Sequence, residues 1–191
     1  MKFMLYGSED SRFLKGVRGR AAKHGIDCVL TDKIKPCEFY ICDWETFPEH
    51  KELPYGFNLD YPVPAVAVAT VNLASEQYKD LTGKTVLIIG RGNATQGMPQ
   101  LFLNKNATPI IAHSKTDNLL ALILIADIVV NAAPPVDLED YRTILKNKLL
   151  IDLVGKTPAK LFEHIIDAGT VGKETTRLIV NKMVNMNGAE N

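Results

Sequence analysis

The stretch TVLIIGRGNATQGMP, residues 85–99, decides the fold of this 191-residue chain. A continuous apolar run ends at Gly90, a turn containing Gly92 and Gly97 follows, and a helical pattern begins after it. At such a junction, glycines let the backbone approach a pyrophosphate, whose charge the exposed N–H groups and the helix dipole stabilise. The stretch predicts a dinucleotide site, although its spacing is not the usual G-x-G-x-x-G and also suits a glycine-rich turn without a ligand.

Apolar segments alternate with helical patterns from residue 83 onward. Four of them are predicted strands, KTVLIIG, TPIIAHS, ADIVVNAA and KLLIDLVG, with helices expected after Pro99, Asp117 and Asp137. Near-continuous apolar strands are typical of a parallel sheet that helices cover on both faces. Residues 65–74, rich in alanine and valine, are predicted to form a helix packed between lobes. We therefore predict a Rossmann-type α/β cofactor domain over residues 65–191.

The first 64 residues indicate a small N-terminal α/β lobe. KFMLYG, IDCVL and EFYICD are predicted strands, and apolar residues recur at helical spacing between Ser11 and His24. Gly25 is expected to end this helix, since glycine accepts the left-handed conformation common just after a helix C-terminus. Four of the ten prolines fall in residues 47–64, which predicts a linker or a loop that lines a cleft.

Charge and apolar content exclude several classes of partner. Lysine plus arginine equals aspartate plus glutamate at 22 each, so no overall field favours nucleic acid or an anionic membrane. The N-terminus lacks the apolar core of a signal peptide. The most apolar stretch, residues 119–135, is interrupted by Asp127 and Asn131 and falls short of the roughly 20 residues of a membrane helix. We expect a cytoplasmic protein that binds a small molecule, not nucleic acid or a membrane.

Three cysteines, Cys28, Cys37 and Cys42, are an odd number in a chain without an export signal, which argues against a disulfide framework. We expect free, mostly buried thiols. A zinc site at Cys37 and Cys42 is the functional alternative, but the sequence has neither a C-x-x-C pair nor a second pair of ligands. No metal site is therefore expected.

The strand after the glycine turn ends in His113, Ser114, Lys115 and Thr116. In an NAD site this strand ends in an acidic residue, which accepts hydrogen bonds from the ribose hydroxyls and would repel a 2′-phosphate. Hydroxyls, an imidazole and a lysine would bind the phosphate instead, and Arg91 in the glycine turn lies where it could contribute. The pattern predicts NADP. The alternative is an ordinary polar loop that caps a helix at Ser114 or Thr116.

Six motifs occur in an order known from one enzyme family. They are LTGK (81–84), GRGNATQGMP (90–99), AHSKTDNL (112–119), ADIVVNAA (126–133), IDLVG (151–155) and GTVGKETT (169–176). Together they resemble the methylenetetrahydrofolate dehydrogenase/cyclohydrolase family of one-carbon metabolism. The resemblance implies NADP-dependent oxidation of 5,10-methylenetetrahydrofolate to 5,10-methenyltetrahydrofolate. It also implies a tetrahydrofolate derivative as substrate and a homodimer formed through the cofactor lobe.

The residue types and the resemblance together assign roles to particular residues. Those expected to bind the cofactor are Gly90, Arg91, Gly92, Asn93, Gly97, His113, Ser114, Lys115, Thr116, Ala133 and Thr175. Those expected to bind the substrate are Asp43, Gly56, Pro62, Gly169 and Val171. The segment GTVGKETT is expected to be a cleft-facing turn and helix start, and its residues by themselves indicate a helix that begins at Lys173. Asp43 and Trp44 equally suit a capping aspartate and a packing tryptophan.

The chain departs from the family pattern in several places. Its glycine loop is one residue longer, with Gly92 in place of a serine, and IDLVG has an additional residue before its glycine. The N-terminal lobe is much shorter. The family's Tyr-x-x-x-Lys pair on the first helix becomes Ser11 and Lys15, with Arg18 as a second cation. Lys15 is therefore the candidate catalytic residue, and a plain surface lysine on an amphipathic helix is the alternative.

The two reactions of the family make different demands on these residues. Hydride transfer from the folate to NADP needs mainly the alignment of two rings. Hydrolysis of the methenyl product needs an activated water and a placed charge, which the family's lysine supplies. We therefore expect weak or absent cyclohydrolase activity. The alternatives are a catalytically inactive NADP-binding regulatory protein and a dehydrogenase for another small substrate.

Overall fold

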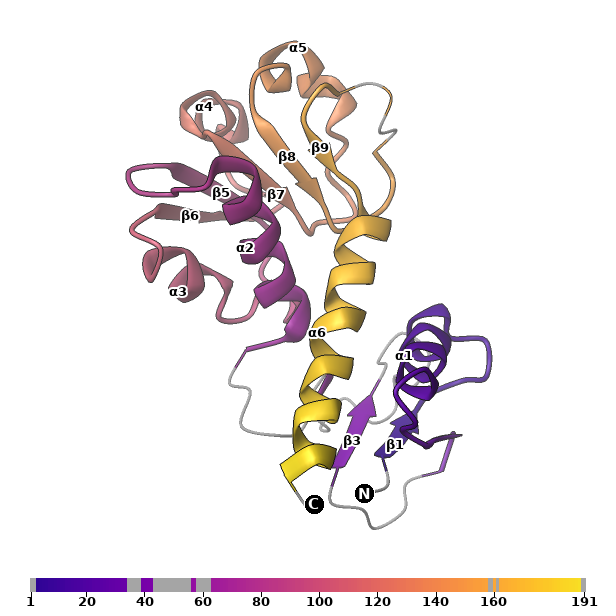
Figure 1. The fold of residues 1–191 in the computed structure, drawn as a ribbon. Coiled ribbons are helices and arrows are strands. Elements are labelled where there is room, and N and C mark those ends of the chain that lie inside the picture. The colour runs from indigo at the N-terminus through magenta and orange to yellow at the C-terminus, as the bar shows by residue number, and fades with distance from the viewer. Residues whose placement is uncertain are drawn as a thin grey trace. The chain divides into compact units, whose positions relative to one another are not determined.

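The computed structural model describes residues 3–33, 39–42, 56–57, 63–157, 160 and 162–189 (Figure 1). The chain divides into two compact units, Met1–Ala65 with Gly172–Asn191, and Val66–Val171. The predicted cofactor domain extended to residue 191, whereas the last twenty residues, 172–191, group with the first unit. The physical reason is that Ile179, Val180 and Met183 pack into the core of that unit.

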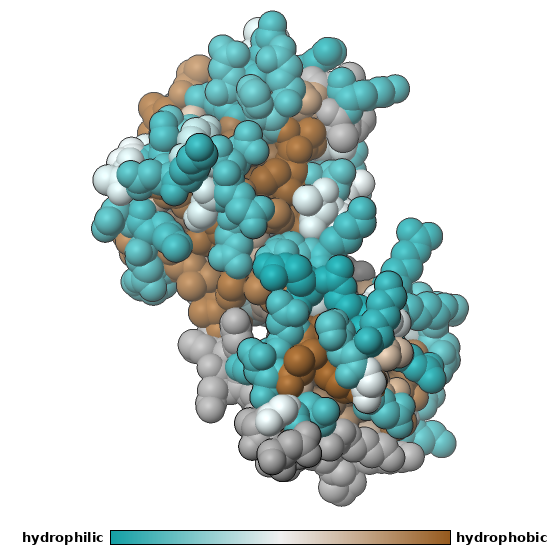
Figure 2. All heavy atoms as spheres, viewed as in Figure 1, coloured by the Kyte–Doolittle hydropathy of each residue, from teal (hydrophilic) through white to brown (hydrophobic). Residues whose placement is uncertain are grey.

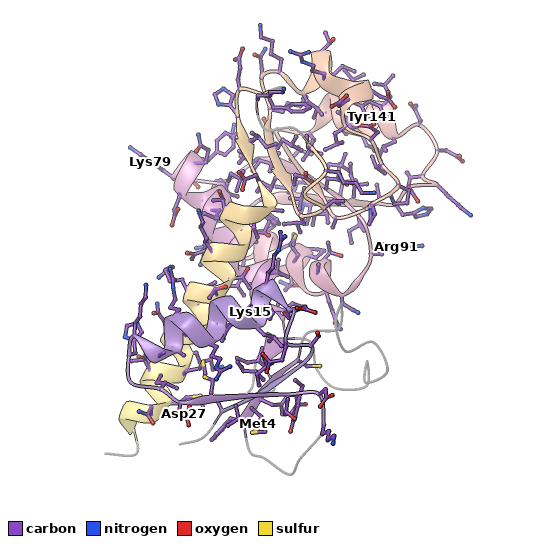
Figure 3. The ribbon with its side chains drawn as sticks, turned by 90° about the vertical axis from the view of Figure 1, so that its right-hand side faces the viewer. Met4, Lys15, Asp27, Lys79, Arg91 and Tyr141 are labelled. Carbon is purple, nitrogen blue, oxygen red and sulfur yellow. The ribbon has the colours of Figure 1, made fainter. Side chains whose placement is uncertain are left out.

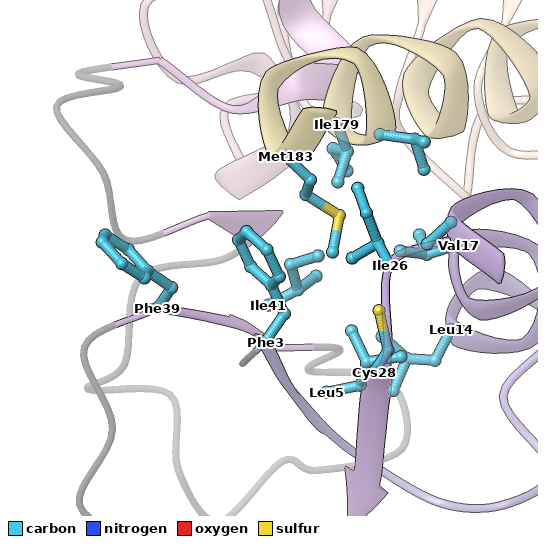
Figure 4. Close-up of a cluster of buried hydrophobic side chains, with 12 residues drawn as sticks. Phe3, Leu5, Leu14, Val17, Ile26, Cys28, Phe39, Ile41, Ile179 and Met183 are labelled. Atoms are coloured by element: carbon cyan, nitrogen blue, oxygen red, sulfur yellow. The ribbon is translucent and has the colours of Figure 1, made fainter. Parts of the chain in front are cut away.

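The first unit contains a four-stranded sheet. Its elements are β1 (Phe3–Tyr6), α1 (Arg12–Ala22), β2 (Cys28–Thr31), β3 (Phe39–Cys42), β4 (Gly56–Phe57) and most of α6 (Ala168–Ala189). The strand order is β2-β1-β3-β4, in which β1 pairs in parallel with β2 and β3, and β4 runs antiparallel to β3. Figure 4 shows its core, where buried side chains of β1, α1 and α6 such as Phe3, Leu14 and Met183 belong to one cluster.

Local signals at both ends of α1 explain its length. The hydroxyl of Ser11 accepts a hydrogen bond from the N–H of Leu14 at 3.0 Å and so caps the first turn. Gly25 has a φ of +70°, and its N–H donates to the carbonyl of Ala22 at 3.1 Å. The N–H of Ile26 donates to the carbonyl of Ala21 at 3.1 Å, which completes a Schellman motif. The predicted stop at Gly25 is confirmed.

Gly19→Ala is expected to stabilise the protein by about 0.5–1 kcal/mol, because glycine inside a helix loses more backbone entropy on folding than alanine. Gly19 lies within α1, and a Cβ at this position would meet no atom within 4 Å. A chemical denaturation curve measures the change. Gly25→Ala is the matched control and should destabilise, since its positive φ strains any L side chain. Equal effects of the two substitutions would contradict the prediction.

Cys28 and Cys42 are buried thiols of the first unit, as predicted. Burial, followed by the charge of Asp27, raises the pKa of Cys28 to about 11. The Cys28 thiol is therefore protonated at neutral pH. Cys37 lies outside the described residues.

The second unit is built on a five-stranded parallel sheet with the order β6-β5-β7-β8-β9. Its strands are β5 (Thr85–Ile89), β6 (Thr108–Ala112), β7 (Ile128–Asn131), β8 (Leu149–Asp152) and β9 (Ile165–Ile166). Its helices are α2 (Ala65–Tyr78), η2 (Asn93–Thr95), α3 (Met98–Leu103), α4 (Leu119–Ile125), η3 (Glu139–Tyr141) and α5 (Arg142–Leu145). The predicted α/β fold with a Rossmann-type parallel sheet is confirmed.

The strands at the centre of this sheet are buried along their length. All four residues of β7 and all but the first of β5 are buried, as expected for strands covered on both faces. Each of the four strands predicted from apolar runs is present, whereas the two-residue strand β9 was not predicted. The helix predicted over residues 65–74 continues to Tyr78.

The surface of the second unit is partly apolar. Brown, hydrophobic spheres interrupt the hydrophilic surface of this unit in Figure 2. Its exposed large hydrophobic side chains are Leu103, Ile111, Leu120, Leu124 and Ile125. Among the described residues, no helix is both long enough and apolar enough to cross a membrane.

Candidate functional site

The first glycine of the loop after β5 is held against a neighbouring strand end. The N–H of Gly90 donates to the carbonyl of Ala112 at 2.8 Å, and the N–H of Ala132 donates to the carbonyl of Ile89 at 2.8 Å. Gly90 has a φ of +127°, and a Cβ there would lie 3.0 Å from the carbonyl carbon and oxygen of Ala132. Only glycine fits this position without a shift of the backbone.

The next three residues of the loop present unpaired backbone donors. In the part of the chain that the structure describes, the N–H groups of Arg91, Gly92 and Asn93 have no hydrogen-bond acceptor. These residues line a pocket of about 470 Å³, together with Thr95, Gln96, Gly97 and residues of β5, β6 and α3. Successive free N–H groups in a loop form an anion-binding concavity. The loop therefore fits a pyrophosphate group.

Helix α3 contributes less to this site than the sequence suggested. It has only six residues, Met98–Leu103, and starts directly after Gly97. A helix dipole sums the dipoles of aligned peptide units, so a short helix supplies a weaker field. The N–H groups of the loop itself are the main donors for an anion here.

The turn after β6 is folded by its own side chains. The hydroxyl of Thr116 accepts a hydrogen bond from the N–H of His113 at 2.9 Å. The Nδ1 atom of His113 accepts one from the N–H of Lys115 at 3.0 Å. Ser114 and Lys115 are exposed, and neither side chain has a partner among the described residues. The hydroxyl of Ser114 and the ammonium of Lys115 are therefore available to a ligand.

The N-cap of α4 is Asn118, not Ser114 or Thr116. The Oδ1 atom of Asn118 accepts a hydrogen bond from the N–H of Ala121 at 3.3 Å. The cap that the alternative interpretation placed at Ser114 or Thr116 is therefore wrong, while an ordinary polar loop remains an alternative. A cap at either earlier residue was predicted because serine and threonine are favoured there, but the helix starts later, at Leu119.

The ends of β5 and β6 are adjacent and carry cations, and the first carboxylate beyond them along the chain is the exposed Asp117 in the turn after β6. Ile89 and Ala112 pair across the two parallel strands, so Arg91 and Ser114 each lie two residues beyond a paired position. Residues 81–116 contain no aspartate or glutamate. Arg91 is exposed at the surface of the second unit (Figure 3), and its side chain has no acidic partner among the described residues. This edge of the sheet suits a second anionic group.

Buried polar side chains shape the loops after β7 and β8. The Oδ1 atom of Asn131 accepts a hydrogen bond from the N–H of Ala133 at 3.1 Å, and Ala133 is nearly buried. The carboxylate of Asp152 accepts hydrogen bonds from the N–H groups of Val154 (3.0 Å) and Thr157 (2.9 Å). Sequence analysis did not single out Asn131 or Asp152, although a polar residue at the end of an apolar run was an available signal.

The predicted site residues of the first unit lie in several different environments. Lys15 is exposed on α1 (Figure 3), and it has no acidic partner among the described residues. Ser11, four residues earlier, is buried as the helix cap. Thr175 lies on α6 and is only 6% exposed. Gly56 opens β4 and pairs with Cys42. Asp43, Trp44 and Pro62 lie outside the described residues.

The segment GTVGKETT is helical from its first residue. Helix α6 begins at Ala168, and the carboxylate of Asp167 accepts a hydrogen bond from the N–H of Thr170 at 2.7 Å. The predicted turn, and the predicted helix start at Lys173, are therefore wrong, because Asp167 caps the helix earlier. Gly169 lies in the first turn, and Val171 is only 2% exposed, which leaves its side chain little surface for a substrate.

A family model describes most of the second unit. Residues 64–179 match the model of the tetrahydrofolate dehydrogenase/cyclohydrolase NAD(P)-binding domain. The bifunctional protein FolD of Clostridium botulinum strain Alaska E43 is 36% identical over 134 residues, which cover 62% of this chain and 47% of that protein. The FolD of Bacillus thuringiensis strain Al Hakam is 40% identical over 95 residues, which cover 48% and 32%. The chain spans about half the length of these curated relatives at most.

Solved structures with low sequence identity share the fold. A FolD methylenetetrahydrofolate dehydrogenase/cyclohydrolase from Campylobacter jejuni has a TM-score of 0.71 at 17% identity, covering 100% of this chain and 88% of that one. The Trypanosoma brucei FolD complexed with NADP and an inhibitor gives 0.64 at 18%, covering 97% and 86%. A shikimate dehydrogenase from Aquifex aeolicus gives 0.62 at 13%, covering 96% and 97%. At these identities the likeness concerns the fold alone.

Proposed function

The chain belongs to the tetrahydrofolate dehydrogenase/cyclohydrolase family, and we propose that it oxidises 5,10-methylenetetrahydrofolate to 5,10-methenyltetrahydrofolate with NADP. The observation that carries the proposal is the loop of unpaired N–H groups beside strand ends that hold cations and hydroxyls. NADP, when bound, supplies the hydride acceptor. The contribution of the protein is to bind and orient it.

The preference for NADP over NAD is proposed from the side chains at two strand ends. The guanidinium of Arg91, the hydroxyl of Ser114 and the ammonium of Lys115 are all exposed. Charged donors form strong hydrogen bonds with a phosphate, whereas an NAD site needs an acidic acceptor for the ribose hydroxyls. Because His113, Ser114 and Lys115, the first residues after β6, include no acidic acceptor, these side chains favour the additional phosphate of NADP.

The residues of the first unit fit the dehydrogenase reaction, which needs no acid or base from the protein, better than they fit the cyclohydrolase reaction. Hydride transfer depends on the alignment of substrate and cofactor, and needs no proton transfer by a side chain. The cyclohydrolase reaction depends on a placed charge near the attacking water. Ser11 occupies the position of the family's tyrosine and is committed to capping α1. The Tyr–Lys pair is therefore incomplete, and we propose weak or absent cyclohydrolase activity.

Lys15→Ala is expected to leave both the dehydrogenase rate and the hydrolysis of the methenyl product unchanged, because Lys15 is an exposed side chain without its tyrosine partner. Hydrolysis is followed by loss of the methenyl absorbance, with the spontaneous rate subtracted. Lys23→Ala, at the C-cap of the same helix, is the control for a general effect of charge. A hydrolysis rate well above the spontaneous one that only Lys15→Ala abolishes would refute this prediction.

The proposed reaction is tested by incubating the protein with methylenetetrahydrofolate and either NADP or NAD. Reduced nicotinamide is followed by its absorbance, and binding of NADPH is measured separately by fluorescence titration. Faster reduction of NADP than of NAD would support the proposed enzyme. Binding of NADPH without turnover would instead support the regulatory alternative. Turnover only with another small substrate would support the second alternative.

We also propose a homodimer formed through the second unit. Strand β6 is an edge strand of the sheet, and its Ile111 is 53% exposed. Exposed apolar side chains on an edge strand invite pairing with another chain. Among the described residues of this unit, helices α3 and α4 carry the other exposed large hydrophobic side chains, Leu103, Leu120, Leu124 and Ile125. A second copy of the chain would cover them.

A further inference from the structure

We propose that Thr95 is the positioning residue that holds the glycine loop in its anion-binding shape. This role rests on the proposed binding of a dinucleotide. Thr95 lies in the stretch that is one residue longer than the family's glycine loop, between Gly92 and Gly97. Thr95 lies within the motif GRGNATQGMP, but the predicted site residues did not include it.

The Thr95 hydroxyl joins two carbonyls of the loop. Its Oγ1 atom lies 2.9 Å from the carbonyl oxygen of Gly92 and 3.2 Å from that of Gly90. The backbone N–H of Thr95 also donates to the carbonyl of Gly92, at 3.1 Å. Thr95 is only 5% exposed, so water cannot readily replace the hydroxyl. A single side chain thus ties together the Gly90–Arg91 and Gly92–Asn93 peptide groups, which flank the Arg91–Gly92 peptide.

The direction of these carbonyls determines where the loop's donors point. In a trans peptide group the C=O and the following N–H point in opposite directions. Because the carbonyls of Gly90 and Gly92 face Thr95, the N–H groups of Arg91 and Asn93 face away from it. Neither N–H has an acceptor in the described part of the chain, and both residues line the pocket. The hydroxyl therefore orients the donors that an anion needs.

The hydroxyl also reduces the electrostatic repulsion that the two carbonyl oxygens would exert on an anion. Two carbonyl oxygens with partial negative charge lie close together in the loop, near the place proposed for a pyrophosphate. A hydroxyl donor partly neutralises both of them. Without it, either peptide group could rotate its oxygen toward the pocket, where it would repel a phosphate. Loss of the hydroxyl is therefore expected to weaken anion binding more than it weakens the fold.

The test compares Thr95→Val, which keeps the shape and removes the hydroxyl, with Thr95→Ser, which keeps the hydroxyl. NADPH affinity is measured by fluorescence titration of the full chain. We expect roughly 10-fold weaker binding for the valine variant and nearly unchanged binding for serine. The KM for NADP should rise in parallel, while the KM for the folate stays constant. Ser75→Ala is the matched control, because it removes a hydroxyl that donates to the carbonyl of Val71 at 2.9 Å on α2.

Several outcomes would overturn the role of Thr95. They are wild-type affinity in the valine variant, loss of affinity in the serine variant, and an equal loss in Ser75→Ala. If the valine variant does not fold, Thr95→Cys replaces it, since a thiol is a weak donor of similar size, and wild-type affinity there would again refute the role. A wild-type protein that binds no NADPH would overturn both this role and the cofactor. Binding without turnover would refute only the folate reaction.

Discussion

Gly90→Ala is expected to abolish dinucleotide binding under ordinary assay conditions. Its Cβ would lie 3.0 Å from the carbonyl carbon and oxygen of Ala132 and 3.2 Å from the Cβ of Ala132. The φ of +127° at Gly90 is strained for any L side chain and adds about 1–3 kcal/mol. The backbone must move to relieve this overlap, and the loop that follows moves with it.

The size of the effect follows from the donors that the loop supplies. Hydrogen bonds to a charged group contribute about 1.5–3 kcal/mol each, so misalignment of two N–H groups weakens binding roughly 100-fold or more. Calorimetric titration with NADPH measures this loss. Gly172→Ala is the control for a glycine-to-alanine change outside the loop, since a Cβ at Gly172 on α6 would meet no atom within 4 Å. Binding by Gly90→Ala as tight as that by Gly172→Ala would show that the loop tolerates the overlap.

Ser114→Asp is expected to reverse the choice between NADP and NAD. Ser114 is exposed beyond the end of β6, in the turn where an NAD site holds its acidic residue. The new carboxylate would repel the 2′-phosphate of NADP and would accept hydrogen bonds from the ribose hydroxyls of NAD. Two like charges about 4 Å apart near a protein surface repel by a few kcal/mol, so NADP affinity should fall roughly 100-fold.

The charge of the new side chain can be separated from its shape. Ser114→Asn places a neutral group of the same shape as aspartate at this position and should change the preference only slightly. Repulsion between partly exposed charges weakens with added salt, so the loss in Ser114→Asp should shrink as ionic strength rises. The measurement is the affinity for NADPH and NADH at low and high salt. Equal behaviour of the two variants would remove Ser114 from the 2′-phosphate site.

Local signals in the chain explain which elements could be predicted. Apolar runs identified β5, β6, β7 and β8, and in β5, β7 and β8 the apolar residues are buried, as expected for strands covered on both faces. Gly25 identified the end of α1, because its positive φ is a property of a single residue. In contrast, β9 has only two residues, too few for a recognisable pattern, and the start of α6 was placed too late because its aspartate cap lies outside the motif that was considered.

Some residues of the candidate site could also be predicted from the sequence, whereas others could not. Residue type alone predicted Gly90, Arg91, Gly92 and the turn around Ser114. Glycines let the backbone approach a phosphate, and cationic and hydroxyl side chains donate hydrogen bonds to it. The prediction missed Thr95, whose hydroxyl acts through hydrogen bonds to backbone carbonyls that no sequence pattern specifies. It also missed Asn131 and Asp152, although each is a polar residue at the end of an apolar run. Asp43 and Pro62 remain predictions, since they lie outside the described residues.

The sequence by itself determined that this chain has a parallel α/β sheet with a glycine loop suited to a dinucleotide phosphate. Periodicity and single-residue conformational preferences are local, so they can be read without coordinates. Only the tertiary structure decided that Gly90 faces Ala132, that Thr95 holds the loop, and that residues 172–191 belong to the first unit. These features depend on contacts between backbone and side-chain groups whose positions are set by the folded chain as a whole.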